Sequence, residues 1–434
     1  MSGSLVDVDL KGARMTFLRS ERLAALLLLA AAVIGVVLAN TPAHDAVEGV
    51  LSTELGPAGT PWHLAVDEWI KDGLLALFFL IAAIELRHEF SRGELRSPAR
   101  AVRPAIAALG GVIVPIGIYL ALTAGTGQDH GWPIPTATDV AFALGVLAVF
   151  GRGFLPSRVR AFLLALAIID DLIGIVFIAV VFAHDIELLP LGIAIAAVAA
   201  FGGLALVIAR GIRRDGREIR PGDTQTVSNP TTGVHPALAG IIIAVMVLLG
   251  IIAWAATLAG GIHPTIAAVA LGLMLPEGPA HRVRSALEPA VNGVVLPIFA
   301  LTASFVVIPH ISEGIQPVFW AIAIALPFGK LIGIAGAGWL ADRLFTKQRR
   351  RRLRVMELLS LGGLGGIGFT VSLLLAALAF ARSPELDAQA TLAVLGGSII
   401  AIVLSGVFLT IEVAGYRGLA KLRAQALEAR DSGA

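Results

Sequence analysis

Long apolar runs separated by short polar connections dominate the pattern of this chain. Each run is close to the ~20 residues that an α-helix needs to cross a bilayer. The runs lie at residues 22–40, 70–88, 104–123, 136–150, 159–183, 188–209, 236–258, 262–276, 290–309, 317–341, 355–381 and 391–414. The pattern therefore predicts an all-α membrane protein with twelve transmembrane helices.

The fourth and eleventh runs contain residues that disfavour a regular helix. Pro133 and Pro135 precede the fourth and cannot continue a helix. The eleventh holds five glycines between residues 362 and 368. Interrupted helices persist in membranes where protein or a water-filled cavity satisfies the freed backbone groups. Close helix packing at the G-x-x-x-G of Gly362 and Gly366 is the alternative interpretation.

Spans 3–5 and 10–12 share one order of features, in which a breaker-rich helix lies between two ordinary helices. Each set has three spans and the sets are seven spans apart, so they have opposite orientations, as in an inverted repeat. Residues 363–368 also match the G-x-G-x-x-G pattern of dinucleotide-binding proteins. That reading needs a strand and a soluble βαβ unit, and a match inside a membrane run argues against it.

The basic residues are distributed asymmetrically across the twelve predicted spans. Of the 33 Lys and Arg residues, all but Lys71, Lys330 and Arg382 fall on one side. The positive-inside rule assigns that side to the cytoplasm. Both ends of the chain, residues 1–21 and 416–434, are therefore predicted to be cytoplasmic, and residues 22–415 to form one membrane domain.

Composition excludes several classes of protein. Charged residues make up 15% of the chain, against about 25% in soluble domains, so the chain is better divided into membrane spans than into globular domains. Cysteine is absent from the sequence, which excludes disulfides, thiolate metal sites and cysteine nucleophiles. The basic run 349–352 lies between two spans, so it is a topology determinant rather than a nucleic-acid site. A signal peptide cleaved after Ala39 is the weaker reading of the first span.

Four charged residues lie well inside the predicted spans, and they are the candidates for chemistry. They are Asp139, Asp170, Asp171 and Lys330. One ionised Asp at mid-membrane costs at least ~2.5–3.5 kcal/mol. Asp170 and Asp171 are about 100° apart on a helix, so one can face a charge partner while the other faces a cavity. Lys330 is the cation available for such pairing, and the other Asp would then titrate and bind cations.

Oxygen-rich surroundings favour an alkali cation at these aspartates. The Thr138 hydroxyl and the carbonyls of broken helices are hard oxygen ligands. Two neighbouring carboxyls also hold protons in coupled steps. A site that binds either protons or a cation indicates an exchanger. The purely structural alternatives are that Asp139 caps a half-helix and that the Lys330 side chain extends to the membrane–water interface.

Two other classes of membrane protein also use buried carboxylates. An intramembrane aspartyl protease carries them on separate helices in Gly-x-Gly-Asp and Tyr-Asp contexts, which this sequence lacks. A passive cation channel does not need a buried Lys beside its acids. Obligatory coupling of proton flux to Na+ would separate an exchanger from a channel.

Several segments resemble the NhaA family of bacterial Na+/H+ antiporters. The long and specific matches are residues 136–148 and 165–172, supported by 329–334, 365–372, 78–80 and 84–86. The resemblance extends from about residue 17 to residue 415. It implies that spans 4 and 11 cross as interrupted helices at mid-membrane. It also implies a transporter, not an enzyme, that has no cofactor.

The resemblance implies roles for the buried charges. Asp170 and Asp171 would carry Na+ or Li+ and protons, with Asp139 and Thr138 nearby and Lys330 paired to Asp170. Two protons would enter for each cation exported, which serves sodium and pH homeostasis.

The resemblance also implies an organisation for the whole chain. An ion-binding core would include about 104–183 and 317–414, and a dimer part about 22–88 and 262–309. Spans such as 1, 2 and 9 would form a homodimer in the lipid of the bacterial inner membrane. No nucleic-acid partner is expected.

Residues for a pH response are the point where this chain departs from the family pattern. Glu85, Glu89 and His263 match family positions, while His88 stands where Arg is usual. The cytoplasmic start of span nine often holds acidic and histidine residues in the family, whereas residues 282–289 read Arg-Val-Arg-Ser-Ala-Leu-Glu-Pro here, with Glu288 as the pH candidate. The resemblance therefore leaves the pH set-point open.

Overall fold

The computed structural model describes residues 21–151, 156–183, 186–214, 236–308, 314–345 and 352–431. The predicted N-terminal tail up to residue 20 and residues 349–351 of the basic run lie outside the described residues. The chain folds into two compact units. The first comprises Met1–Val50, Glu89–Phe177 and Asn292–Ala434, and the second comprises Leu51–His88 and Ile178–Val291.

The described part of the first unit consists of helices. They are α2 (Glu21–Ala39), α3 (His44–Leu51), η2 (Glu94–Arg96), α6 (Pro98–Thr123), η3 (Asp129–Gly131), η4 (Ile134–Thr136), α7 (Val140–Phe150), most of α8 (Ser157–Val181), η5 (Val291–Val295), α13 (Leu296–Ala303), α14 (Pro317–Ile324), η7 (Ala325–Gly329), α15 (Lys330–Phe345), α16 (Val355–Gly365), α17 (Phe369–Ala379) and α18 (Pro384–Asp431).

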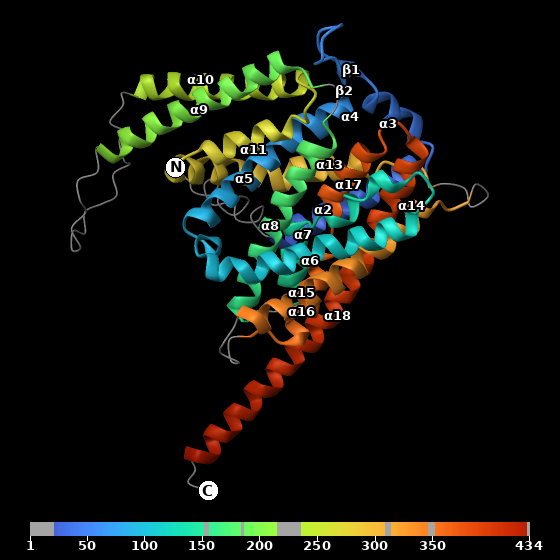
Figure 1. Cartoon of the computed structure of the whole chain (residues 1–434), viewed down its shortest axis with the longest axis vertical. Helices are drawn as coiled ribbons and strands as arrows, with labels where there is room; N and C mark the ends of the chain where they lie inside the picture. Colours follow the sequence, from blue (N-terminus) through green and yellow to red (C-terminus); the bar gives the residue numbers. More distant parts are fainter. Residues whose placement is uncertain are drawn as a thin grey trace, which may run out of the picture. The chain divides into compact units, whose positions relative to one another are not determined.

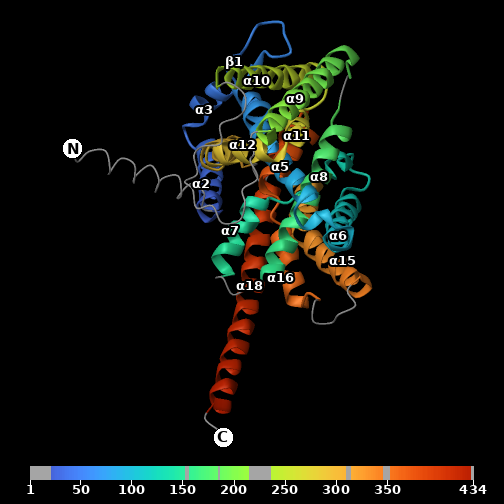
Figure 2. The ribbon, with the colours of Figure 1, turned by 90° about the vertical axis from the view of Figure 1, so that its left-hand side faces the viewer.

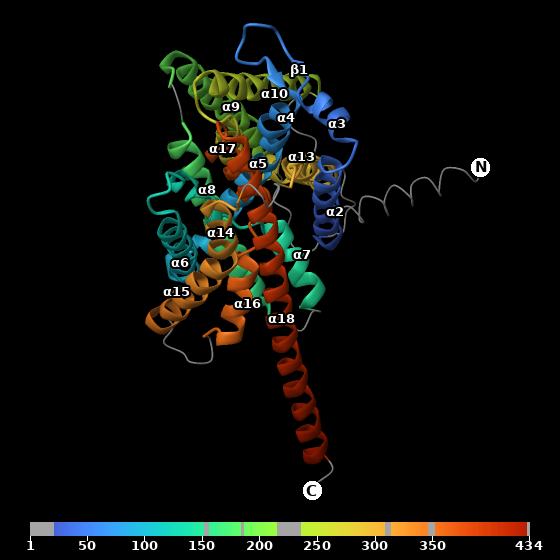
Figure 3. The ribbon, with the colours of Figure 1, turned by 90° about the vertical axis from the view of Figure 1, so that its right-hand side faces the viewer.

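Helices α6 and α15 lie side by side in this unit, as Figure 2 and Figure 3 show from two sides. Small residues let them pack closely. A Cβ atom at Gly333 would collide with the Gly110 carbonyl, and one at Gly329 would lie 2.9 Å from the Cα of Pro115. Backbone approach of this kind is how membrane helices associate without a hydrophobic driving force. The π-helical turn η7 precedes α15 and shifts the pattern of backbone hydrogen bonds by one residue. Lys330 is the first residue of the α-helix that follows.

Both helices predicted to be interrupted are bent in the structure. The η3–η4 segment meets α7 at 42°, and α16 meets α17 at 46°. Asp139 N–H donates to the Ile367 carbonyl at 2.6 Å, so the two breaks contact each other. The glycines also pack closely, since a Cβ at Gly362 would lie 2.8 Å from the Leu331 carbonyl oxygen. The interruption and the close packing, weighed as alternatives, are both present.

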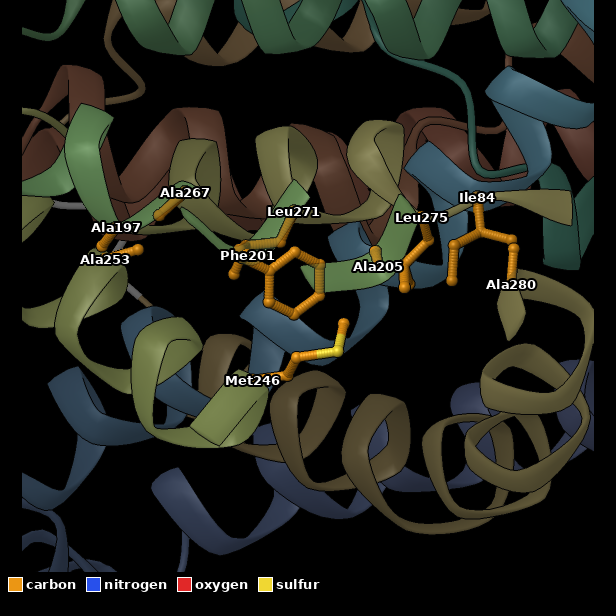
Figure 4. Packing of buried hydrophobic residues seen from close by; sticks show 10 residues of the cluster. All are labelled: Ile84, Ala197, Phe201, Ala205, Met246, Ala253, Ala267, Leu271, Leu275 and Ala280. Carbon is orange, nitrogen blue, oxygen red and sulfur yellow. The ribbon is translucent and has the colours of Figure 1, made fainter. Parts of the chain in front are cut away.

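The second unit contains a small sheet and a layer of helices. Its elements are β1 (Glu54–Leu55), β2 (Leu64–Ala65), α4 (Val66–Glu68), η1 (Trp69–Leu74), most of α5 (Leu75–Ser91), α9 (Leu188–Arg214), α10 (Pro236–Ala259), α11 (Thr265–Met274) and α12 (Glu277–Ala290). Helices α9 and α10 lie side by side (Figure 1). Phe201 of α9 and Met246 of α10 belong to a core that also includes Leu271 and Leu275 (Figure 4).

Each of the twelve predicted spans has a helical counterpart among the described residues. Within the described parts of the chain, seven helices are long and apolar enough to cross a membrane, or up to ten if each of three bent pairs is one span. An all-α, multi-pass membrane protein is therefore confirmed at this level. The count of twelve crossings stays a prediction.

Two elements differ from the sequence expectation. The polar connection after the first span contains the short antiparallel pair β1–β2, with Glu54 opposite Ala65. The ninth span begins earlier, because α12 continues into η5 and α13 as one helical stretch from Glu277 to Ala303. Its first half is polar, so a hydropathy pattern does not include it.

Candidate functional site

The two adjacent aspartates of α8 have different surroundings in the structure. Asp170 is 2% exposed, and Asp171, the next residue, is only half-buried. Successive helix residues point about 100° apart, so the two carboxylates face different environments. Asp170 forms an ion pair through Oδ2 with Nζ of Lys330.

Lys330 is completely buried at the start of α15. Its Nζ also donates to the Thr138 hydroxyl at 3.0 Å. The same hydroxyl lies 2.6 Å from Asp170 Oδ2 and 2.7 Å from the Gly365 carbonyl oxygen. A hydroxyl has one proton, so Thr138 donates to one of these two acceptors at a time and links the ion pair to the end of α16.

One oxygen of Asp170 remains without a hydrogen bond. Oδ1 of Asp170 is buried and has no partner among the described groups. A buried acceptor left unsatisfied is costly, which makes this oxygen a candidate ligand for a cation or a proton. The described residues contain no group of three or more His, Asp or Glu side chains arranged for a metal. Besides the carboxylates of Asp170 and Asp171, any further ligands would be the Thr138 hydroxyl and backbone carbonyls.

Asp139 ties together the second halves of both interrupted helices. Its Oδ1 accepts from the Phe142 N–H at 2.9 Å and caps α7. Its Oδ2 accepts from the Thr370 hydroxyl at 2.9 Å and from the Thr370 N–H at 3.2 Å, at the start of α17. Two helix N-termini thus converge on one buried carboxylate, where their dipoles favour negative charge. Both of its oxygens are engaged, as expected for a cap.

The residues predicted for a pH response lie apart from these aspartates in the chain. Arg284 of α12 forms ion pairs with Glu85 at 2.6 Å and with Glu288 at 3.7 Å. His263 pairs through Nε2 with Asp72 at 3.1 Å. All of these residues belong to the second unit.

The remaining two pH candidates are less buried. His88 is exposed and lines a small cavity together with His281 and Glu277 of α12. Glu89 is half-buried and is assigned to the first unit. Sequence reasoning did not single out Glu277 and His281, although their i,i+4 spacing on a polar helix was a signal.

A second buried polar cluster lies among α8, α16 and α18. Glu357 is completely buried and accepts from Arg158 at 2.7 Å and from the Tyr416 hydroxyl at 2.5 Å. Glu412 is 5% exposed and accepts from the Ser360 hydroxyl at 2.8 Å. Both carboxylates lie near the ends of predicted spans, which is why the sequence interpretation passed over them.

Comparison with known proteins identifies clear relatives. The family model described as Na+/H+ antiporter 1 matches residues 15–249 and 243–409. The chain is 49% identical over 404 residues to a protein of Clavibacter michiganensis named Na(+)/H(+) antiporter NhaA 2, with 92% of each chain covered. It is 39% identical over 396 residues to Na(+)/H(+) antiporter NhaA of Tropheryma whipplei, covering 90% of this chain and 94% of that protein. It is also 39% identical over 413 residues to the Thermobifida fusca protein of the same name, covering 93% and 94%.

Proposed function

Since this chain belongs to the Na+/H+ antiporter 1 family and is a membrane antiporter of Na+ and H+ rather than an enzyme, we propose that Asp170 and Asp171 form its exchange site. The observation that carries this proposal is the asymmetry of Asp170. One of its oxygens is bonded to Lys330 and Thr138, and the other is buried without a partner. Such a group can accept a ligand without first losing its counter-ion.

Exchange follows from competition for the same oxygen atoms. When both carboxyls are ionised, Asp171, Oδ1 of Asp170 and the Thr138 oxygen offer hard ligands suited to Na+ or Li+. When protons occupy the carboxyls, the cation loses these ligands. Two carboxyls this close titrate in coupled steps, so protons and a cation displace each other.

The exchange proposed here is electrogenic. Two protons enter for each Na+ or Li+ exported, so one net charge moves inward per cycle. That charge gains ~2.3 kcal/mol per 100 mV of membrane potential. In this scheme Lys330 is the counter-ion that keeps Asp170 ionised within the membrane, and Asp139 holds the two helix breaks together. A passive channel would not need this buried pair.

The rest of the organisation is proposed on the same basis. Twelve spans would cross the bacterial inner membrane with both termini cytoplasmic, and spans 4 and 11 would cross within an inverted repeat. Homodimers would form through the dimer part and contact membrane lipid. Glu85, His88, Glu89, His263 and Glu288 are the candidate residues for a separate pH sensor. We propose that competition between protons and Na+ at Asp170 and Asp171 contributes more to the pH response than these residues do.

Proton movement in everted membrane vesicles tests the exchange site. Adding Na+ or Li+ to vesicles acidified by respiration should dequench a pH-sensitive dye. Asp171→Asn should abolish this signal, because the cation loses a titratable carboxylate ligand while the helix remains. Asp170→Asn should remove most of it.

A control variant tests whether loss of exchange is specific to the two site aspartates. Asp129 lies in η3 with its side chain 72% exposed, so Asp129→Asn makes the same chemical change away from the site and should exchange at the wild-type rate. Amounts of inserted protein are compared by immunoblot. Wild-type exchange by both Asp170→Asn and Asp171→Asn would overturn the proposed site.

A further inference from the structure

The cluster of α8, α16 and α18 contains two buried carboxylates with opposite surroundings. Glu357 is fully satisfied: Oε1 accepts from Arg158 and Tyr416, and Oε2 accepts from the Arg354 backbone N–H at 2.6 Å. It therefore has the partners of a permanent carboxylate. Glu412, on the neighbouring helix, has a single hydrogen bond, from the Ser360 hydroxyl.

Glu412 lacks the partners that an ionised group needs in this environment. Its Oε1 is buried without a hydrogen-bond partner. Among the described residues, none with a cationic side chain forms an ion pair with it. The charged groups that act on it are Glu357 and Arg354 of α16 and Arg158 of α8.

The two arginines are engaged elsewhere. Arg158 binds Glu357 at 2.7 Å, and the Arg354 guanidinium lies over the Tyr416 ring at 4.9 Å. A buried ionised carboxylate without direct charge-assisted bonds is strongly disfavoured, and such groups take up a proton instead. The surroundings of Glu412 are therefore those of a neutral carboxylic acid.

Helix α16 connects this acid to the proposed exchange site. Ser360, which holds Glu412, precedes Gly365 by five residues, a rise of ~7.5 Å along the helix. The Gly365 carbonyl accepts from Thr138, whose hydroxyl also contacts Asp170. At the other end of α16, Arg354 caps the helix and Arg158 of α8 binds Glu357 in the first turn. The positive-inside rule assigns this end to the cytoplasm.

We propose that Glu412 is a further proton-binding group of the transporter, which passes protons between the exchange site and water at the end of the helices that bears Arg158 and Arg354. This proposal rests on the exchange site proposed above. In one cycle, the O–H bond of the Glu412 carboxyl breaks and its proton goes to a water molecule at that end. The Glu412 carboxylate then accepts, through water, the proton that a carboxyl of the Asp170–Asp171 site releases.

Glu412→Gln tests the proposal, because it keeps the shape and the bond to Ser360 but cannot titrate. In proteoliposomes, its maximal exchange rate should fall at least about tenfold, since a positioned proton-transfer group typically contributes ~10²–10⁴-fold. Half-saturation by Na+ should stay unchanged within about twofold, because the exchange site is intact. Glu412→Asp should recover part of the rate. The matched control is Ser405→Ala, which removes another buried polar group of α18 and should exchange normally.

Infrared spectroscopy and stability measurements test the neutral state directly. At neutral pH the wild type should show a protonated-carboxyl stretching band that Glu412→Gln lacks. Glu412→Gln should melt near the wild-type temperature, whereas Glu357→Gln, which takes the carboxylate from Arg158, should melt clearly lower.

Three results would overturn the proposal. They are a wild-type exchange rate in Glu412→Gln, loss of Na+ binding in that variant, or an unchanged carboxyl band. Failure of the exchange site itself would be seen separately, as wild-type exchange by both Asp170→Asn and Asp171→Asn.

Discussion

Removing Lys330 should destabilise the protein strongly, because it strands a buried charge. Lys330 is 0% exposed and Asp170 is 2% exposed, and the two form an ion pair. Breaking a buried pair by deleting one partner typically costs ~3–5 kcal/mol. Replacing both partners is far less harmful, because no charge is left unpaired. Lys330→Ala combined with Asp170→Asn should therefore cost much less than the sum of the two single variants.

The measurement is unfolding in detergent solution, arranged as a double-mutant cycle. The control is Lys71→Ala, since Lys71 pairs with Asp67 at 3.2 Å with side chains 28% and 33% exposed. A surface pair of this kind contributes about 0–1 kcal/mol. Additive effects of the two site variants, or equal melting temperatures for the wild type and Lys330→Ala, would refute the Asp170–Lys330 pair as a stabilising contact.

Lys330→Arg separates the electrostatic role from proton release. Arginine keeps the positive charge but is practically untitratable. If Lys330 is a counter-ion only, Arg should exchange at near the wild-type rate. If it releases a proton during the cycle, Arg should fold well yet exchange slowly.

Three further outcomes are expected. Protons and Na+ compete for the aspartates, so raising the Na+ concentration should shift the half-activation pH of exchange downward. The shift should be up to about one unit per tenfold Na+ for each competing proton. Glu288→Ala should barely change that profile, and a profile that ignores Na+ would instead favour a dedicated sensor. Gly333→Ala should lower the unfolding temperature, because overpacking the contact with α6 costs ~1–3 kcal/mol of stability. Gly336→Ala should not, because the space around Gly336 is open. Equal melting temperatures for the two variants would contradict the close approach of α6 and α15. A cysteine at Thr126 should react with an impermeant thiol reagent outside intact cells and one at Ser91 should not; the reverse would contradict the orientation.

Sequence patterns could predict the membrane class and the candidate site, because both depend on local chemistry. A charge inside a twenty-residue apolar run is too costly to occur without a partner, so Asp170, Asp171 and Lys330 were visible from the sequence. Proline and glycine act on the backbone of their own segment, so the bends near Asp139 and Gly366 were visible as well.

Pairings between distant segments needed the tertiary structure. The contacts of Asp139 with Thr370 and of Glu412 with Ser360 join residues 231 and 52 positions apart, and no periodicity encodes which helices become neighbours. Glu357 and Glu412 lie near the ends of predicted spans, where charged residues are common, and only the tertiary structure shows that they are buried. The sequence by itself determined which groups could not be left unpaired in a membrane. Helix packing alone decided which partners they received, because it sets the distances on which hydrogen bonds and ion pairs depend.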